Sequence, residues 1–403
     1  MVQKELQRKT HAAGLASQKA FLWLLILISW RPITYRQLLV EALPQGGKSY
    51  NNGNDSEEDY YLADSKVVPP PRRPNPNSVS LSSTSQQFSK KSAAFVQPPL
   101  SMDEVISRPV TVTIQGYGKV VGRREGGIDV WRGIPYAAPP VGALRFAPPE
   151  PPQPWSPTKL DASRFAPDCW QTADLVMNPA VNEMSEDCLY LNIWTPAGHA
   201  ARSRQGKFLS GKKLLPVMLW LHGGAFQQGG GHRPEYDGRR LAEREAIVVT
   251  VNYRLGAMGF LVSSSDGLYG NYGLMDQRAA IYWVHENIEA FGGDPNSVTL
   301  FGESAGAVMT GLHLMMEGAG TLFHRAILQS NPLGYTFRSV IVADFIGEAL
   351  KQKVDCRDLT CLRSERVEEI MAAQASLMGV PRSVGDFFTW GPTLTKEIKV
   401  QLT

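Results

Sequence analysis

The chain has few cysteines, little net charge and no long apolar run near its start. Its 41 basic residues nearly balance 38 acidic ones, leaving a net charge of +3 over 403 residues. That balance argues against a nucleic-acid partner. No phosphate-binding loop, nucleotide motif or metal-ligand cluster is found, so we expect no cofactor and no metal. The ordinary hydrophobic share of 43% favours a globular protein of one large domain or two smaller ones.

The few cysteines fall into two local pairs. An even number in this arrangement favours disulfides formed in an oxidising compartment, and free or buried thiols are the alternative. Metal binding is less favoured, because no histidine stands near either pair at the spacing of a zinc ligand. The residues are Cys169, Cys188, Cys356 and Cys361.

The apolar run near the N-terminus, Phe21–Trp30, is too short to cross about 30 Å of hydrocarbon as a helix. It follows several basic residues and fits the core of a signal peptide, which predicts a secreted, extracellular protein. The nearest small-x-small cleavage site, at Val40–Ala42, lies far beyond the run. A signal anchor that attaches the chain to a membrane through the same run is therefore the alternative.

Residues 1–45 form this signal-peptide or signal-anchor region, and residues 46–105 differ from it in composition. The second segment is rich in Gly, Asn, Ser, Pro and charge and has few apolar residues. It has too little apolar surface to offset its conformational entropy, so we expect a disordered linker. Its triplet Asn54-Asp55-Ser56 makes Asn54 a candidate glycosylation site in an exported chain.

An alternation of strand-like and helix-like segments follows. Residues 110–137 alternate branched side chains with turn residues, which indicates an antiparallel hairpin or meander. Later apolar runs are continuous, as in strands covered on both faces, and helical spacing separates them. A mostly parallel sheet is therefore predicted. The expected elements are strands at 188–196, 216–224, 246–254, 298–301 and 325–330, and helices at 274–291 and 307–316.

The stretch Gly302-Glu303-Ser304-Ala305-Gly306 stands between one of these strands and the next helix. Strand, GxSxG and helix in this order are typical of a nucleophile elbow, in which a tight turn projects the serine hydroxyl. The two outer glycines leave room for neighbouring backbone, and the N-terminus of the helix favours a developing negative charge. The pattern predicts that Ser304 attacks a carbonyl carbon.

A second motif, Trp-Leu-His-Gly-Gly-Ala-Phe at residues 220–226, follows an earlier strand. Small residues let a substrate carbonyl approach backbone N–H groups closely, and loss of one such donor costs about 10²–10³ in rate. We expect an oxyanion hole formed by the N–H groups of Gly224, Ala225 and Ala305.

Several further motifs occur in a fixed order and together resemble the type-B carboxylesterase and cholinesterase family of α/β-hydrolases. The resemblance implies an α/β-hydrolase fold over residues 106–393, with a mostly parallel central sheet and N-terminal antiparallel strands. It implies a carboxylic ester hydrolase that acts on a small-molecule ester through an acyl-enzyme intermediate at Ser304. It gives no oligomeric state. The motifs are RGIPYAAPPVGALRF (132–146), SEDCLYLNIWTP (185–196), NYRLGAMGFL (252–261), the run 270–307 and FHRAILQS (323–330).

The resemblance also assigns structural roles. It implies disulfides Cys169–Cys188 and Cys356–Cys361, the second closing an unusually short loop. It places Arg145 opposite Glu186 in a structural ion pair.

The family's triad continues from the serine to an acid and then a histidine, but no histidine follows His324 in this sequence. His313 is expected to point away from the hydroxyl, His222 has no acid–base part in the family, and His232 is a weak outside candidate. The acids Asp344, Glu348 and Asp386 lie in no recognisable family motif. An acid without a histidine builds no triad, so we expect poor activity or none.

Residues 394–403 do not resemble the family, and the C-terminal part of the fold is expected to be missing, as in a splice form or an incomplete gene model. Two alternative functions remain open. One is a non-catalytic binding or adhesion protein built on the same fold. The other is a fragment with no function of its own.

Overall fold

The computed structural model describes residues 108–172, 183–200, 213–331, 337–377 and 389–393. The predicted export segment Phe21–Trp30, the linker with Asn54, the acid Asp386 and residues 394–403 lie outside these ranges. Within them, no helix combines the length and the apolar character that crossing a membrane requires.

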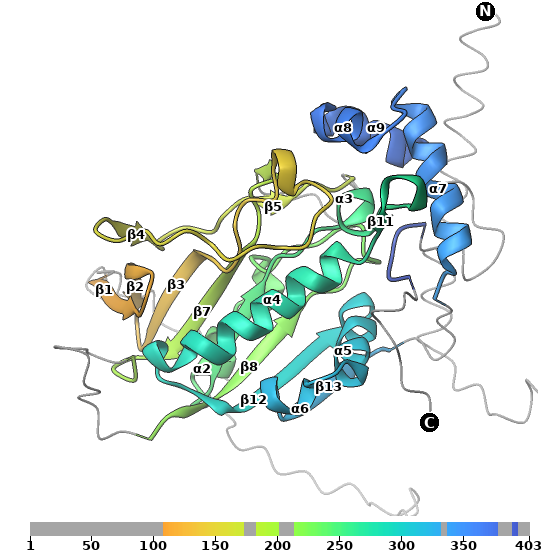
Figure 1. The fold of residues 1–403 in the computed structure, drawn as a ribbon. Helices are drawn as coiled ribbons and strands as arrows, with labels where there is room; N and C mark the ends of the chain where they lie inside the picture. The colour runs from red at the N-terminus through yellow and green to blue at the C-terminus, as the bar shows by residue number, and fades with distance from the viewer. Residues whose placement is uncertain (1–107, 173–182, 201–212, 332–336, 378–388, 394–403) are drawn as a thin grey trace, which may run out of the picture. The chain divides into compact units, whose positions relative to one another are not determined.

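A mixed sheet forms the centre of the described part (Figure 1). Its strands follow the order β1-β2-β3-β7-β9-β8-β12-β13, and a short strand β4 pairs with β2. The pairs from β1 through β9 are antiparallel, and those from β9 through β13 are parallel. The prediction of an α/β fold with antiparallel N-terminal strands followed by parallel strands is confirmed. The strands are β1 (Arg108–Ile114), β2 (Gly118–Glu125), β3 (Ile128–Pro135), β4 (Lys159–Asp161), β7 (Tyr190–Pro196), β8 (Leu215–Leu221), β9 (Ile247–Val251), β12 (Gly293–Glu303) and β13 (Arg325–Gln329).

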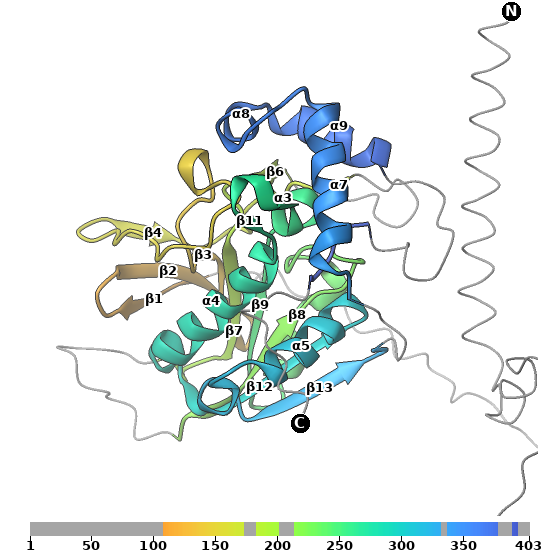
Figure 2. The same ribbon diagram turned by 45° about the vertical axis from the view of Figure 1, so that its right-hand side comes forward.

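Helices and two small additional sheets surround these strands (Figures 1 and 2). Helix α5 packs on β8, β12 and β13, and α4 packs on β12. All residues of β9 are buried, as the continuous apolar run predicted for a strand covered on both faces. The elements are α2 (Arg239–Ala242), α3 (Gly256–Phe260), α4 (Tyr272–Asn287), α5 (Ala305–Met315), α6 (Ala319–Leu322), α7 (Val340–Lys353), α8 (Leu359–Ser364), α9 (Val367–Leu377), β5 (Asp168–Cys169) with β6 (Met184–Ser185), and β10 (Val262–Ser263) with β11 (Leu268–Tyr269).

The boundary between α4 and β12 follows from one glycine. After α4 ends at Asn287, a 3-10 turn continues to Phe291. Gly292 then adopts φ +91°, a left-handed conformation that side chains disfavour, and stops the helical segment. Strand β12 begins at the next residue, Gly293, and is therefore much longer than the predicted strand at 298–301.

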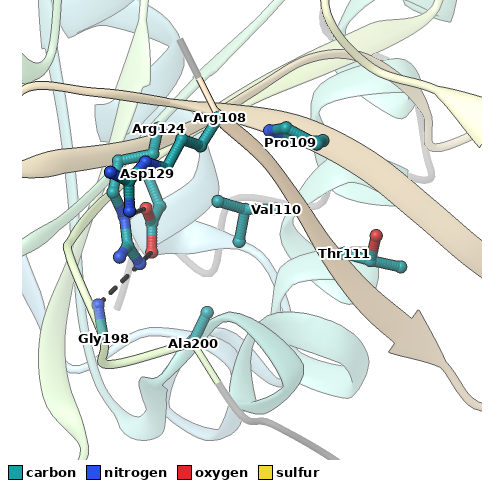
Figure 3. A pocket seen from close by; sticks show the side chains of 8 residues that line it. All are labelled: Arg108, Pro109, Val110, Thr111, Arg124, Asp129, Gly198 and Ala200. Carbon is teal, nitrogen blue, oxygen red and sulfur yellow. Dashed lines mark hydrogen bonds and ion pairs between the residues drawn. The ribbon is translucent and has the colours of Figure 1, made fainter. Parts of the chain in front are cut away.

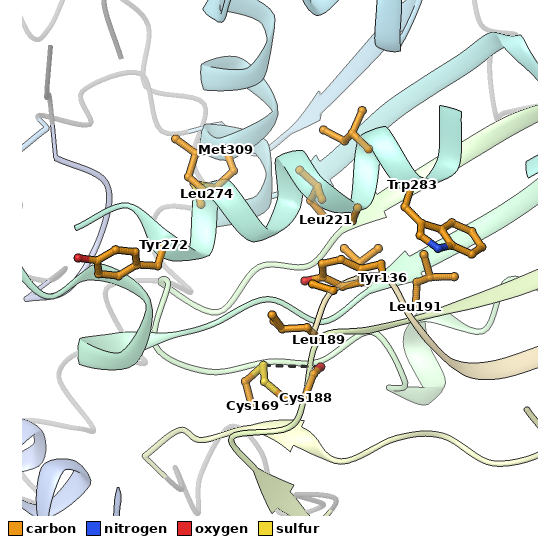
Figure 4. Packing of buried hydrophobic residues seen from close by; sticks show 14 of the residues in the cluster. Tyr136, Cys169, Cys188, Leu189, Leu191, Leu221, Tyr272, Leu274, Trp283 and Met309 are labelled. Carbon is orange, nitrogen blue, oxygen red and sulfur yellow. Dashed lines mark hydrogen bonds between the residues drawn. A yellow bond between two sulfur atoms is a disulfide. The ribbon is translucent and has the colours of Figure 1, made fainter. Parts of the chain in front are cut away.

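The hydrophobic core lies between the sheet and the helices that cover it (Figure 4). Leu191 of β7 and Leu221 of β8 are fully buried, and Trp283 of α4 and Met309 of α5 are also buried. Each side chain of this size contributes about 1.5–3 kcal/mol when it is removed from water. The ring of Trp283 lies 6.2 Å from that of Phe291, centroid to centroid, which joins α4 to the turn that follows it.

Candidate active site

Ser304 stands in a strained turn between β12 and α5. Its backbone has φ +53° and ψ −119°, a conformation that costs a residue with a side chain about 1–3 kcal/mol and occurs mainly at functional sites. Its N–H donates to the carbonyl oxygen of Gln329 at 2.9 Å, and its own carbonyl accepts from the N–H of Val308 at 3.0 Å. The residue is half-buried, so its side chain is not enclosed in the core.

Two glycines make this turn sterically feasible. A Cβ on Gly306 would overlap the carbonyl oxygen of Leu221. A Cβ on Gly302 would lie 2.5 Å from the carbonyl group of Gly306 and 2.8 Å from that of Leu221. These obstacles are backbone atoms and cannot move aside as a side chain would, so the fold requires glycine at both positions.

The oxyanion segment, His222–Phe226, leaves the end of β8 beside this turn. Gly302 of β12 pairs with Leu221 of β8, so the carboxyl ends of the two parallel strands are adjacent. A Cβ on Gly223 would lie 3.4 Å from the Cβ of Ser304, which shows how closely the segment approaches the serine.

The oxyanion segment has an unusual backbone. Gly224, Ala225 and Phe226 have φ values of +110°, +55° and +61°. The N–H groups of Gln227 and Gln228 both donate to the carbonyl of Gly224 at 3.0 Å and close a turn. Consecutive turn residues of this kind direct backbone N–H groups toward one concave side, which suits an anion.

The three predicted oxyanion donors are the N–H groups of Gly224, Ala225 and Ala305. Within the described ranges, none of the three donates a hydrogen bond to another group of the chain. Gly224 and Ala225 are half-buried, and Ala305 begins α5, where the first N–H groups have no partner within the helix.

Both disulfides implied by the resemblance are present, one joining Cys169 to Cys188 and the other Cys356 to Cys361. Arg145 and Glu186 form a bidentate ion pair, with nitrogen–oxygen distances of 2.7 and 2.6 Å. The remaining guanidinium nitrogen of the largely buried arginine donates to the carbonyl oxygens of Leu362 and Glu365, at 3.0 and 2.6 Å. Arg145 therefore links α8 to Glu186, which lies close to the Cys169–Cys188 disulfide in the sequence.

The histidines near the site interact with groups other than the serine. Nδ1 of buried His222 lies 2.8 Å from the carbonyl oxygen of Gly223, which requires a proton on that nitrogen, and burial lowers the pKa of the ring to about 3. Nδ1 of His232 lies 2.8 Å from Oδ1 of Asp168. His222 thus contacts the backbone of the oxyanion segment, whereas His232 contacts a carboxylate side chain.

Two histidines after the serine also interact elsewhere. In α5, Nε2 of His313 contacts Oε1 of Gln277 at 3.0 Å, and burial lowers the pKa of this imidazole to about 3. Nδ1 of His324 accepts from the N–H of Val298 at 3.3 Å. Across the described ranges, no imidazole hydrogen-bonds to the hydroxyl of Ser304.

The acids after the serine have structural partners. Asp344 accepts a hydrogen bond from the N–H of Ser264, and Glu348 pairs with Lys351 at 3.1 Å. Glu303, which sequence reasoning did not single out, is closer to the site. A Cβ on Gly223 would lie 2.8 Å from its Oε2, and partial burial raises the pKa of this carboxyl.

A separate cavity of about 250 Å³ opens beside β1 (Figure 3). Arg124 and Asp129 form an ion pair on its wall, and the N–H of Gly198 donates to the same carboxylate at 3.3 Å. Neither Ser304 nor the oxyanion segment lines this cavity.

Sequence reasoning missed several residues that hold the oxyanion segment. The ring of Tyr253 stacks on that of His222 at 4.3 Å, and its hydroxyl donates to the His222 carbonyl at 2.7 Å. Gln171 binds the backbone of Gly229 through both ends of its amide. The only sequence signal for these contacts is the run of three glycines at 229–231.

Comparison with known proteins identifies related chains. The sequence model described as "Carboxylesterase family" matches residues 108–401. A para-nitrobenzyl esterase of Bacillus subtilis (strain 168) is 50% identical over 224 residues, covering 54% of this chain and 43% of that protein. An acetylcholinesterase of Bungarus fasciatus is 39% identical over 292 residues, covering 66% of this chain and 46% of that protein.

A solved structure of a PNB esterase superposes with a TM-score of 0.62 at 42% sequence identity. The match covers 71% of this chain and 57% of that one. The chain thus spans less than half the length of these two curated relatives.

Proposed function

The chain belongs to the carboxylesterase family, and from this premise we propose that Ser304 is the nucleophile of a carboxylic ester hydrolase. The observation that carries the proposal is the strained backbone of Ser304, with φ +53°, beside the N–H groups of Gly224 and Ala225, which donate to no other group of the described ranges. A fold maintains such strain in a residue with a side chain only where many contacts impose it. We infer that this turn presents the hydroxyl to an ester carbonyl carbon whose oxygen is held by the N–H groups of Gly224, Ala225 and Ala305.

The proposed chemistry has two stages. Oγ of Ser304 attacks the ester carbonyl carbon, and the carbonyl π electrons move onto oxygen to give a tetrahedral oxyanion. The N–H groups of Gly224, Ala225 and Ala305 stabilise that charge. Collapse of the intermediate breaks the C–O bond to the leaving group, which departs as an alkoxide and takes a proton from water to become the alcohol, and an acyl group stays on Oγ. Water then attacks the acyl-enzyme and releases the carboxylic acid.

The proton on the hydroxyl limits the rate of this sequence. In a complete triad an imidazole removes it, and loss of that base costs on the order of 10⁶ in turnover in a well-studied protease. No imidazole of the described ranges hydrogen-bonds to Ser304, so we propose that the proton passes to hydroxide from the solvent. We therefore propose a slow esterase whose acyl-enzyme forms and decays slowly.

Acylation of one named residue tests the proposal. The chain is incubated with a fluorophosphonate and, separately, with 4-nitrophenyl acetate, and the adduct is located by intact-mass and peptide mass spectrometry. We expect one slow adduct at Ser304 and none at that peptide in Ser304→Ala. The proposal is contradicted if the folded wild-type chain is acylated no faster than Ser304→Ala.

A non-catalytic binding protein is the second candidate, and one observation favours it. Within the described ranges, the contacts of the imidazoles near the site go to groups other than Ser304, so no base for the serine is seen there. This candidate predicts no ester turnover above that of Ser304→Ala, so the same acylation experiment separates the two functions.

A further inference from the structure

A run of glycines follows the oxyanion segment, and buried side chains from other parts of the chain hold it. The N–H of Gly231 donates to Oδ1 of Asn252 at 2.8 Å. The carbonyl of Gly231 accepts from Oγ1 of Thr250 at 2.6 Å. Both partners stand at the end of β9, so the sheet itself fixes the far end of the run.

Gln171 fixes the start of this glycine run, at Gly229. Its Nε2 donates to the carbonyl of Gly229 at 2.9 Å, and its Oε1 accepts from the N–H of Gly229 at 2.9 Å. The same Nε2 also donates to the carbonyl of Cys169 at 3.1 Å, beside the Cys169–Cys188 disulfide. The residue is only 2% exposed. One buried amide thus pairs with both polar backbone groups of Gly229 and is itself oriented by the disulfide region.

Gly229 transmits this restraint to the oxyanion segment. Its φ is +123°, and a Cβ there would overlap Nδ1 of His222, so its backbone packs against that imidazole. The imidazole in turn contacts the carbonyl of Gly223 at 2.8 Å. Fixed contacts therefore run from Gln171 through Gly229 and His222 to the residue that precedes the oxyanion donors.

We propose that Gln171 is a positioning residue for the oxyanion hole. It holds the exit of the turn at Gly229, so that the N–H groups of Gly224 and Ala225 keep their direction. Gln171 makes no hydrogen bond to Ser304 in the described part of the chain, and it acts through the backbone of Gly229 and the imidazole of His222. The inference rests on the proposed function only in naming an ester oxyanion as the group that these N–H donors bind.

Hydrogen exchange tests this role without requiring any ester turnover. Gln171→Met keeps the length of the side chain and removes its hydrogen bonds. Gln277→Ala is the matched control, because it deletes another buried glutamine whose hydrogen bond goes to His313. The readout is the exchange rate of the Gln227 and Gln228 amides, which close the turn on the carbonyl of Gly224.

We expect Gln171→Met to speed exchange of these two amides about tenfold or more relative to wild type, since a lost buried hydrogen bond has about that effect on a local opening equilibrium. Gln277→Ala should leave them within about twofold of wild type at a denaturant concentration where all three proteins are folded. Equal rates in Gln171→Met and wild type would overturn the proposal. Equal acceleration in both variants would also overturn it, because the effect would then be one of global stability.

The wild-type chain supplies a test that needs no variant. If Gln171 and Gly229 hold the turn, the amides of Gly229, Gln227 and Gln228 become exposed in the same opening event. Their exchange rates, after correction for the intrinsic rate of each amide, should then lie within about threefold of each other. A Gly229 amide that exchanges about thirtyfold faster than the other two would contradict the proposal. Failure to acylate Ser304 leaves these rates unaffected, so the positioning role and the proposed function fail separately.

Discussion

The oxyanion segment and helix α7 place their phenylalanines in opposite ways. Phe226 of the oxyanion segment is completely buried, and its carbonyl accepts from the N–H of Gly256 at 2.7 Å. Phe345 of α7 is 77% exposed, and Ile341 one turn earlier is 82% exposed. The contrast shows that the segment after β8 is anchored in the core through Phe226, whereas α7 displays apolar side chains that the described residues leave exposed.

The largest effect is expected where backbone approaches backbone at the nucleophile turn. Gly306→Ala places a Cβ into the carbonyl oxygen of Leu221, and we expect it to destabilise the fold by about 3 kcal/mol or more. Gly311→Ala is the control in the same helix, where a Cβ would meet only Leu328 at 3.5 Å. That change should be neutral or stabilising by up to about 1 kcal/mol. Urea unfolding measures both, and similar stabilities for the two variants would refute the steric account of the turn.

The two disulfides sharpen the comparison, because one supports the oxyanion side and the other lies between α7 and α8. In the chain-entropy relation, the separation of 19 residues between Cys169 and Cys188 corresponds to about 3 kcal/mol, and the separation of 5 between Cys356 and Cys361 to about 2 kcal/mol. Paired serine substitutions should lower the free energy of unfolding in that order. Urea midpoints in the reverse order would show that loop length does not govern the difference.

Acidification is expected to lower the free energy of unfolding through the buried His313, by an amount between those of the largest and smallest predictions. Burial lowers the pKa of His313 to about 3, below its ordinary 6.5, so the unfolded chain binds this proton more tightly. The stability that depends on a neutral ring is fully present above pH 6.5 and is lost as the pH falls toward 3. At pH 5 the loss amounts to about 2 kcal/mol.

His313→Gln removes this titration while leaving a side chain that can still bond Gln277. Urea unfolding at pH 7.5 and pH 5 should show a loss of stability that is about 2 kcal/mol smaller in the variant than in wild type. Equal losses in the two proteins would mean that His313 is not a source of the acid sensitivity.

Sequence reasoning located the turns at Ser304 and at Gly224–Phe226 because their signals are local. Gly302, Ser304 and Gly306 lie within five consecutive positions, and residues this small indicate a sterically crowded turn. Alternation and apolar runs likewise predicted the strands, since burial on both faces of β9 follows directly from its composition. The start of β12 was missed, because Gly293 joins the sheet through pairing with Leu215 rather than through its own preference.

The supports of the site could not be predicted in this way. Gln171 is 58 residues from Gly229 in the sequence, and nothing in its neighbours marks it as buried. Tyr253 and His222 are separated by 31 residues and meet only because β8 and β9 are adjacent. Long-range contacts between side chain and backbone depend on the assembled sheet.

The smallest effect is expected at α7. Phe345→Ser and Ile341→Ser remove apolar atoms that are already in water, so each should change the free energy of unfolding by less than about 0.5 kcal/mol. Phe226→Ser, at the buried phenylalanine of the oxyanion segment, should cost about 3 kcal/mol or more. Thermal unfolding compares the three variants. A loss above about 2 kcal/mol for Phe345→Ser would show that α7 is covered in solution.

The pH dependence of Ser304 acylation tests the central claim most directly. Without an imidazole base the attacking species is formed by hydroxide, so the logarithm of the acylation rate with 4-nitrophenyl acetate should rise by about one per pH unit from pH 5 to 9. His222 and His313, with pKa values lowered to about 3, stay neutral throughout that range and add no inflection. A rate that levels off above about pH 7 would contradict the account, because it would reveal a histidine acting on the serine.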